Sequence, residues 1–232
     1  PAALGAGRAE IAPVARRSPN YRDGVFVNLE PSTTLSLDRE ERRRLLWEVF
    51  GSRGASKPPG PIPVVAPAPA DPNHTGASAC WFGHSSVLIE VDGYRVLADP
   101  IWSRRCSPSQ TVGPQRLHEV PVDLDRLAAL DAVLISHDHY DHLDMDTVVA
   151  LAHTQRAPFV VPLGIGAHLR KWGIPDSRIV ELDWYDSHRI GELTLICTPA
   201  RHFSGRSFTR NTTLWASWVI IGSRHRAFFG GD

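Results

Sequence analysis

Residues 136–144 constrain the fold of this chain more than any other stretch. They contain three histidines and three aspartates, and they directly follow the apolar run at residues 132–135. A buried strand that ends in imidazoles and carboxylates is typical of a metal site, because both groups bind zinc and similar ions. A solvated polar loop is the alternative interpretation, but it does not explain three histidines immediately after a buried strand.

The spacing within this stretch predicts two metal positions. His137 and His139 are two residues apart, so in an extended segment their side chains point the same way. Asp141 and His142 follow where the chain must turn toward a helix, so they can face a second position beside the first. This is the geometry of two metals roughly 3.5–4 Å apart that share a hydroxide.

Composition excludes several classes of protein. The chain has 232 residues, 42% of them hydrophobic and 22% charged, and a formal net charge of zero. These values predict a soluble globular protein and give no reason to expect nucleic acid as a partner. The three cysteines, Cys80, Cys106 and Cys197, are odd in number and widely spaced, which favours a reducing, cytoplasmic location without disulfides. No window approaches the roughly 18 apolar residues of a membrane-spanning helix.

The first 76 residues are expected to lie outside the compact domain. Residues 1–19 show no apolar period and predict a flexible or loosely docked arm. A helix should begin at Asp38, with Glu41 in the capping-box position, and end near Gly51. The many prolines between residues 52 and 72 predict a semi-extended linker, so the domain should run from residue 77 to residue 232.

Two interpretations are open for the expected helix. Leu45, Trp47 and Phe50 lie on or beside its apolar stripe, and arginines occupy the other side. An ordinary amphipathic helix packed on the domain explains this pattern. Arginines beside large apolar side chains also suit a lipid interface, so peripheral membrane contact or a dimer contact through these three residues is the alternative.

From residue 77 onward, short strands alternate with helices. Asp92-Gly93 separates two strand-like runs and predicts a tight hairpin. The expected strands are residues 79–83, 86–91, 94–98, 132–135, 159–163, 178–182, 193–199, 213–221 and 225–229. The expected helices are residues 125–130, 145–153 and 165–172. This order predicts an α/β arrangement, with residues 101–121 as a long loop that shapes a substrate pocket.

Four further polar residues stand at the ends of expected strands. Asp99 by itself would more often be a turn former, and His84 and His202 by themselves would be loop or structural histidines as readily as site residues. Asp232 follows Gly230 and Gly231, and two glycines allow a sharp turn that brings a carboxylate close to another group.

The order of these motifs resembles the metallo-β-lactamase superfamily. The resemblance is carried by His137-x-His139-x-Asp141-His142, then by the strand-end histidine and by Gly-Gly-Asp. Phrases at residues 81–86, 99–103 and 112–116 resemble the branch that contains N-acyl-phosphatidylethanolamine-hydrolysing phospholipase D and its bacterial relatives. The resemblance implies an αββα sandwich, of which this chain would carry the N-terminal half and an arm.

The resemblance also implies roles for the site residues. His137, His139 and His202 would hold one zinc ion, Asp141 and His142 a second, and Asp232 would bridge both. Asp99 and His84 would support the ligands, and Asp141 and Asp232 would be the carboxylates at the reacting centre. The family pattern has one more histidine on a later strand, so we expect an exposed apolar sheet face and a longer chain, a companion fragment or a homodimer.

The implied activity is zinc-dependent phosphodiester hydrolysis by a hydroxide that bridges two metals. N-acyl-phosphatidylethanolamine or a simpler phosphodiester would be the substrate. A lactone or β-lactam hydrolase on the same dinuclear site is one alternative, because this site serves several reactions on one fold. A non-catalytic, metal-stabilised module is the other.

Overall fold

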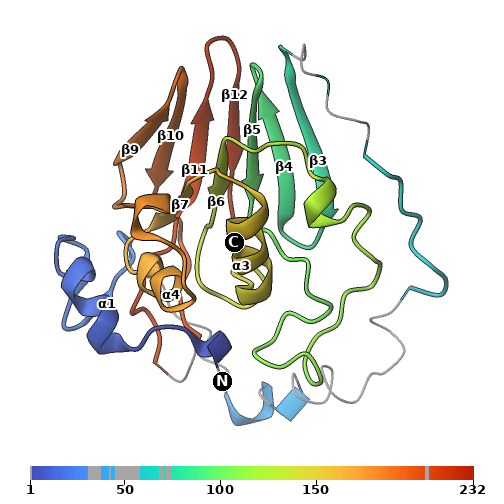
Figure 1. The fold of residues 1–232 in the computed structure, drawn as a ribbon. Helices are drawn as coiled ribbons and strands as arrows, with labels where there is room; N and C mark the ends of the chain where they lie inside the picture. The colour runs from blue at the N-terminus through green and yellow to red at the C-terminus, as the bar shows by residue number, and fades with distance from the viewer. Residues whose placement is uncertain are drawn as a thin grey trace.

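Two stacked β-sheets with helices on one outer side form the body of the protein (Figure 1). The computed structural model describes residues 2–30, 38–41, 43–44, 58–67, 71, 75–206 and 209–232. One sheet has six strands, in the order β3 (Ala77–Gly83), β4 (Ser86–Val91), β5 (Tyr94–Ala98), β6 (Ala132–Leu134), β7 (Phe159–Pro162) and β8 (Ile179–Leu182). The other has four strands, in the order β12 (Arg226–Phe229), β11 (Ser217–Ile221), β10 (Leu193–Thr198) and β9 (Ser187–Ile190).

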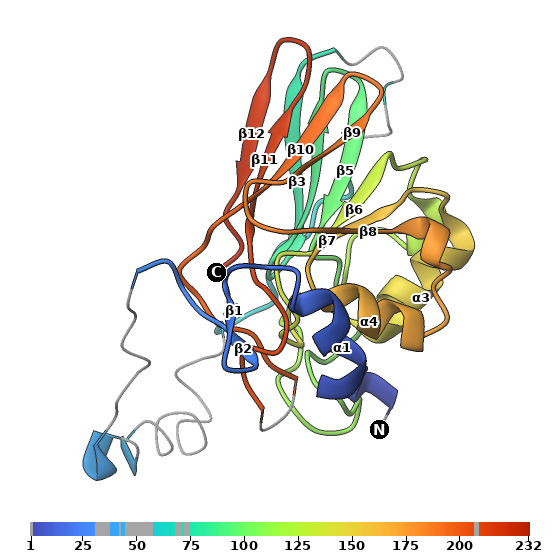
Figure 2. The same cartoon turned by 90° about the vertical axis from the view of Figure 1, so that its left-hand side faces the viewer.

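The six-stranded sheet changes direction at β5. Strands β3, β4 and β5 pair antiparallel, and the β4–β5 turn is the predicted hairpin, with positive φ at Asp92 and Gly93. Strands β5 to β8 run parallel, which requires crossover connections. Helices α3 (Met145–Thr154) and α4 (Ile165–Lys171) lie in these crossovers, as predicted, and cover one face of the sheet (Figure 2).

Alternating side chains of the parallel strands fill two cores. Val133 and Phe159 point toward the helices, where they pack with Leu151 and other buried residues. Their neighbours Leu134 and Val160 point the other way and pack among side chains from the four-stranded sheet. Both faces of β6 and β7 are therefore buried, which explains why the sequences of these two strands are continuous apolar runs.

The second sheet exposes apolar side chains on its outer face. Phe228 pairs with Val219 and is 67% exposed, and Val219 and Ile221 are partly exposed. The expected exposure of an apolar sheet face is confirmed for these residues. The metallo-β-lactamase type of two-sheet arrangement is also confirmed, with four strands of the second sheet present.

The N-terminal residues differ from the expected loose arm. Residues 2–30, here called the N-terminal arm, contain helix α1 (Arg8–Ala15) and a hairpin of β1 (Tyr21–Arg22) and β2 (Val25–Phe26). Ile11, Ala15 and Phe26 are buried in the core between the sheets and the arm. The prediction of a flexible arm was wrong because three well-spaced apolar anchors suffice to dock it, and they are too few to form a visible period.

The predicted capping box at residue 38 is confirmed. Asp38 Oδ1 accepts hydrogen bonds from the backbone N–H groups of Glu40 and Glu41, both at 2.8 Å, and Glu41 Oε2 accepts from Asp38 N at 2.9 Å. Residues 39–41 and 43–44 are helical. Leu45, Trp47 and Phe50 lie outside the described residues, so their surface role stays a prediction, as does the domain boundary at residue 77.

Three elements differ from their predicted form. Residues 124–126 form a short 3-10 helix in place of the expected helix at 125–130. Strand β9 was not predicted, because its sequence Ser-His-Arg-Ile is polar and it gains its partner only from β10 at the sheet edge. Residues 213–216 are not in the sheet, because Leu214 and Ala216 donate to the backbone of Leu163 and Ser136 instead.

Candidate metal centre

The predicted site residues meet at one edge of the sandwich, where several strands end. Asp99 follows β5, His137 comes three residues after β6, His202 follows β10 and Asp232 follows β12. His84 lies in the turn between β3 and β4. Because β5 and β6 are parallel and the second sheet stacks on the first, residues as far apart in the sequence as His84 and Asp232 come together at one site.

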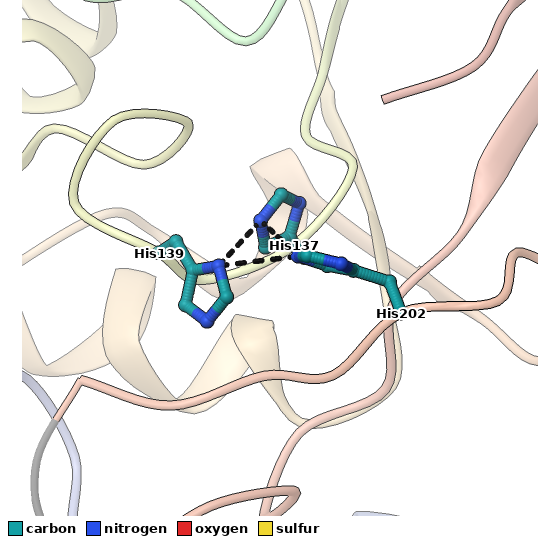
Figure 3. A group of neighbouring side chains, drawn as sticks. All are labelled: His137, His139 and His202. Carbon is teal, nitrogen blue, oxygen red and sulfur yellow. Dashed lines mark hydrogen bonds between the residues drawn. The ribbon is translucent and has the colours of Figure 1, made fainter. Parts of the chain in front are cut away.

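Three imidazoles form the first ligand group (Figure 3). His137 Nε2 lies 2.8 Å from His139 Nδ1 and 3.2 Å from His202 Nε2, and the last two atoms are 3.3 Å apart. Nitrogen ligands at 2.0–2.1 Å from a tetrahedral ion lie roughly 3.3 Å from one another. The spacing of the three nitrogens therefore fits one metal ion.

Burial keeps these three histidines neutral. Desolvation lowers the pKa of His137, and the neighbouring imidazoles of His142, His139 and His202 lower it further. Desolvation is also the main cause that lowers the pKa of His139 and of His202. A neutral imidazole presents a nitrogen lone pair, which is the form that binds a metal.

A second ligand group contains His84, Asp141 and His142. His142 is buried, and its Nε2 atom makes no hydrogen bond, although Asp232 Oδ1 lies 3.2 Å away. An unsatisfied buried polar atom calls for an explanation such as an ion at the site. Burial opposes protonation of His142, but the hydrogen bond to Asp99 and the nearby carboxylates raise its pKa above the ordinary value.

Asp99 orients ligands of both groups. This fully buried carboxylate accepts hydrogen bonds from Ser136 N at 2.6 Å, from Ser136 Oγ at 2.5 Å and from His142 Nδ1 at 2.7 Å. Ser136 Oγ in turn lies 2.9 Å from His137 Nδ1. These bonds engage the Nδ1 atoms of both histidines and leave their Nε2 atoms for a metal. The supporting role of Asp99 toward a bound metal stays a prediction.

Asp232 faces both groups, and its bridging role stays a prediction. Its Oδ1 lies 3.2 Å from His142 Nε2 and its Oδ2 lies 3.8 Å from His202 Nε2. Gly231 has a φ of +66°, and a Cβ atom there would lie 2.8 Å from Ser136 Cβ. Only glycine allows the chain this close to Ser136, so the predicted sharp turn is confirmed.

His84 contacts Asp141, another residue of the second group, directly. Its Nε2 lies 2.9 Å from Asp141 Oδ2, and Ser85 Oγ donates to the Asp141 carbonyl at 2.7 Å. Desolvation acts to raise the pKa of Asp141, but the hydrogen bond to His84 and the charge of His142 outweigh it and hold the pKa at about 2. Asp141 is therefore an ionised ligand held in place by the β3–β4 turn.

A cavity of about 740 Å³ opens beside the second group. Asp141, His84 and His139 are polar residues of its lining, and Trp81 and Leu117, both more than half exposed, are apolar ones. Cys106 and residues 114–118 of the long loop also line it, as predicted for a loop that shapes a pocket. The ligands thus border a space large enough for a substrate with an apolar part.

Several residues near the ligands were not predicted from the sequence. Ser136 belongs to the motif but carried no separate signal. Asn28 and Arg206 contact the motif or His202 from segments that gave no hint of a site. Only the three-dimensional structure brings them together.

The Beta-lactamase superfamily domain matches residues 94–232. This chain belongs to the metallo-β-lactamase superfamily. The predicted resemblance is confirmed, and the ligand groups described above lie within the matched region or, for His84, just before it.

Curated relatives extend the match. An uncharacterised protein of Mycobacterium tuberculosis is 62% identical over the whole chain, which covers 62% of that protein. N-acyl-phosphatidylethanolamine-hydrolyzing phospholipase D 1 of Caenorhabditis elegans is 35% identical over 69% of this chain and 48% of that protein. A metal-dependent hydrolase of Pyrobaculum aerophilum is 31% identical over 66% of this chain and 60% of that protein. The chain thus spans about half to two thirds of the length of these relatives.

A solved structure supports the metallo-β-lactamase fold. A metallo hydrolase from Ignicoccus hospitalis superposes with a TM-score of 0.50 at 22% identity, covering 67% of this chain and 60% of that one. In the part of the chain that the structure describes, no helix is both long and apolar enough to span a membrane.

Proposed function

We propose that this chain carries the metal centre of a zinc-dependent phosphodiester hydrolase. The observation that supports this best is the pair of adjoining ligand groups, which a third group of His137, His142 and Asp232 connects and which border a partly apolar cavity. The similarity to a phospholipase D of Caenorhabditis elegans favours N-acylated phospholipids or simpler phosphodiesters as the substrate class.

The donor atoms fit two zinc ions. His137, His139 and His202 would hold one, Asp141 and His142 the other, and Asp232 would contact both. When bound, the two ions would supply Lewis acidity and lower the pKa of a bound water toward neutrality. The neutral state of the three histidines and the ionised state of Asp141 are the states that such ions require.

The remaining residues prepare the site for this chemistry. Asp99 holds His142 directly and His137 through Ser136, so that both ligands are oriented before a metal binds. His84 holds Asp141 at the rim of the cavity. Trp81 and Leu117 can cover the apolar part of a substrate and exclude water from it, while a charged phosphodiester would lie beside the polar residues of the lining.

A panel of substrates tests the reaction class. The zinc-loaded protein is offered bis(p-nitrophenyl) phosphate, N-acyl-phosphatidylethanolamine in mixed micelles, an acyl lactone and a β-lactam. We expect hydrolysis of the phosphodiesters, its loss in His137→Ala, and normal rates in His153→Ala, which changes an exposed histidine on α3. Hydrolysis of the lactone or β-lactam alone would assign the other reaction class, and zinc binding without any hydrolysis would leave a metal-stabilised module.

Native mass spectrometry tests the composition of the site. We expect two zinc ions per chain, and a companion fragment or a second copy would appear as added polypeptide mass. A chain with one ion or none would contradict the dinuclear proposal.

A further inference from the structure

The N-terminal arm makes direct contact with the backbone of a metal-binding residue. Asn28 Nδ2 donates to the His202 carbonyl at 2.9 Å, and His202 N donates back to Asn28 Oδ1 at 3.3 Å. The two residues are 174 positions apart in the chain. This side chain therefore pairs with both backbone groups of His202, as a neighbouring strand would.

The neighbours of Asn28 determine the orientation of its amide. Trp215 Nε1 donates to Asn28 Oδ1 at 3.1 Å and to the Ala200 carbonyl at 2.9 Å. A flipped amide would place its NH₂ group against the N–H groups of both Trp215 and His202, so only one orientation satisfies all partners. An amide is required here, because no other short side chain offers a donor and an acceptor side by side.

The arm holds the rest of this loop as well. Phe26 N donates a hydrogen bond to the Asn211 carbonyl at 2.7 Å. Asn211 is in turn hydrogen-bonded to the backbone of Ser204, two residues after His202. The buried Phe26 side chain anchors this end of the arm in the core. Asn28 is thus a fixed point against which the His202 backbone is set.

A second connection runs from the first residues of the arm to the motif. Buried Arg206 donates to the Ala3 carbonyl through Nε and Nη2, at 3.0 and 2.8 Å. Its Nη1 donates to the carbonyls of Asp138 and Leu143, at 2.8 and 2.7 Å. The arm therefore contacts His202 directly and the His137–His139 segment through Arg206.

We propose that Asn28 is a positioning residue for the metal-binding imidazole of His202, so that docking of the N-terminal arm and metal binding stabilise each other. This inference rests on the proposed binding of metal by His137, His139 and His202, and it goes beyond it by assigning part of the metal affinity to the arm. Linkage requires the coupling to be reciprocal, so the metal must stabilise the docked arm as much as the arm strengthens metal binding.

The first experiment measures Co²⁺ and Zn²⁺ affinity by competition with a chelator, together with the visible absorption of the Co²⁺ form. Asn28→Asp keeps the size and the acceptor but sets an oxygen against the His202 carbonyl. We expect affinity to fall roughly tenfold, the low end for groups that orient metal ligands, and the cobalt spectrum to change. Asn20→Asp makes the same chemical change elsewhere in the arm, at a residue whose backbone carbonyl accepts a hydrogen bond from Val27 N. It is the control and should leave the metal affinity and the cobalt spectrum within twofold of the wild-type values.

A double-mutant cycle separates positioning from general stability. In a His202→Ala background the Asn28→Asp change should cost no further affinity, because the ligand that it positions is gone. Arg8→Ala removes bonds to the carbonyls of Asp23 and Gly24 within the arm and serves as a control for arm stability. A loss of affinity in Arg8→Ala as large as that in Asn28→Asp would refute the positioning role of Asn28, because it would trace the loss to arm stability. Additive losses in the cycle would also overturn that role.

Hydrogen exchange gives a readout that is independent of affinity. Added Zn²⁺ should slow exchange at the amides of residues 26–28 in the wild-type protein but not in His202→Ala. A wild-type protein that binds zinc without slowing these amides would overturn this inference alone. Failure of the wild-type protein to bind zinc at all would overturn the proposed function with it.

Discussion

Oδ2 of Asp99 lies 2.7 Å from Nδ1 of His142, and the same oxygen accepts a hydrogen bond from Ser136 Oγ. One buried carboxylate thus orients residues of both candidate ligand groups. Asp99→Asn keeps the shape but removes the charge, so we expect affinity at both positions to fall roughly 10–100-fold. Isothermal titration with Zn²⁺ measures this. Asp176→Asn, at an exposed ion pair with Arg170, is the matched control and should bind normally.

Metal binding should stabilise the fold. At a free zinc concentration about 100 times Kd, linkage adds about 2.7 kcal/mol to the free energy of unfolding. For a domain of this size we expect Tm to rise by roughly 5–10 °C. Differential scanning calorimetry with and without Zn²⁺ measures the shift. His139→Ala should abolish most of it, and a shift of the same size in that variant would contradict the ligand assignment.

The metal-free protein should lose stability as the pH falls below about 6.5. Burial lowers the pKa of His137, His139 and His202 in the folded state, so between their folded and ordinary values the unfolded chain binds more protons. The raised pKa of His142 makes a contribution of the opposite sign, but the three histidines with lowered pKa values outweigh it. Asp141 does not titrate in this window, because its pKa is about 2.

Thermal melts in chelator at pH 7.5 and pH 5.5 test this pH dependence. We expect a lower Tm at pH 5.5, and a smaller drop in His202→Gln, which removes one of the three groups. A wild-type protein that melts higher at pH 5.5 would show that the histidines are not held neutral.

Arg206 should be the most sensitive arginine in the described part of the chain. It is buried, it donates to three backbone carbonyls, and its guanidinium lies over the rings of Tyr140 and Trp172. Arg206→Met would leave those carbonyls unsatisfied at about 1–3 kcal/mol each. We expect the free energy of unfolding in urea to fall by about 3 kcal/mol or more. Arg210→Met, an exposed residue over Phe203, should cost less than about 1 kcal/mol.

The apolar lining of the cavity should discriminate substrates by their apolar part. Trp81 is 61% exposed there, so Trp81→Ser should raise KM for a long-chain phosphodiester roughly tenfold and leave kcat and short-chain substrates nearly unchanged. Phe228→Ser removes an equally exposed aromatic from the outer sheet face and is the control. Equal effects on long and short substrates would show that Trp81 does not contact the apolar part.

Much of the fold was predictable because the core strands are short apolar runs that can be identified in the sequence. The runs around Leu134 and Val160 are buried on both faces, and each is apolar throughout. The Asp92-Gly93 turn and the Asp38–Glu41 capping box are local contacts, which short sequence patterns predict well. The metal motif was predictable for the same reason, since four of its ligands lie within six residues.

What escaped prediction depends on distant partners. Strand β9 is polar and becomes a strand only by pairing with β10. The buried side chains of helix α1 are Ile11 and Ala15, and they stand among alanines and a proline that give no period. Asn28 has no sequence signal as a site residue, because its role exists only when residue 202 lies beside it.

The separation of 174 residues between Asn28 and His202 has a consequence for synthesis on the ribosome. At a translation rate of about 5–20 residues per second, the arm emerges roughly 10–35 s before the residue that it contacts. Ile11 and Phe26, the apolar anchors of the arm, therefore remain in a nascent chain without their native surroundings during that interval. Such a chain is expected to need protection by chaperones until the segment that carries His202 reaches the arm.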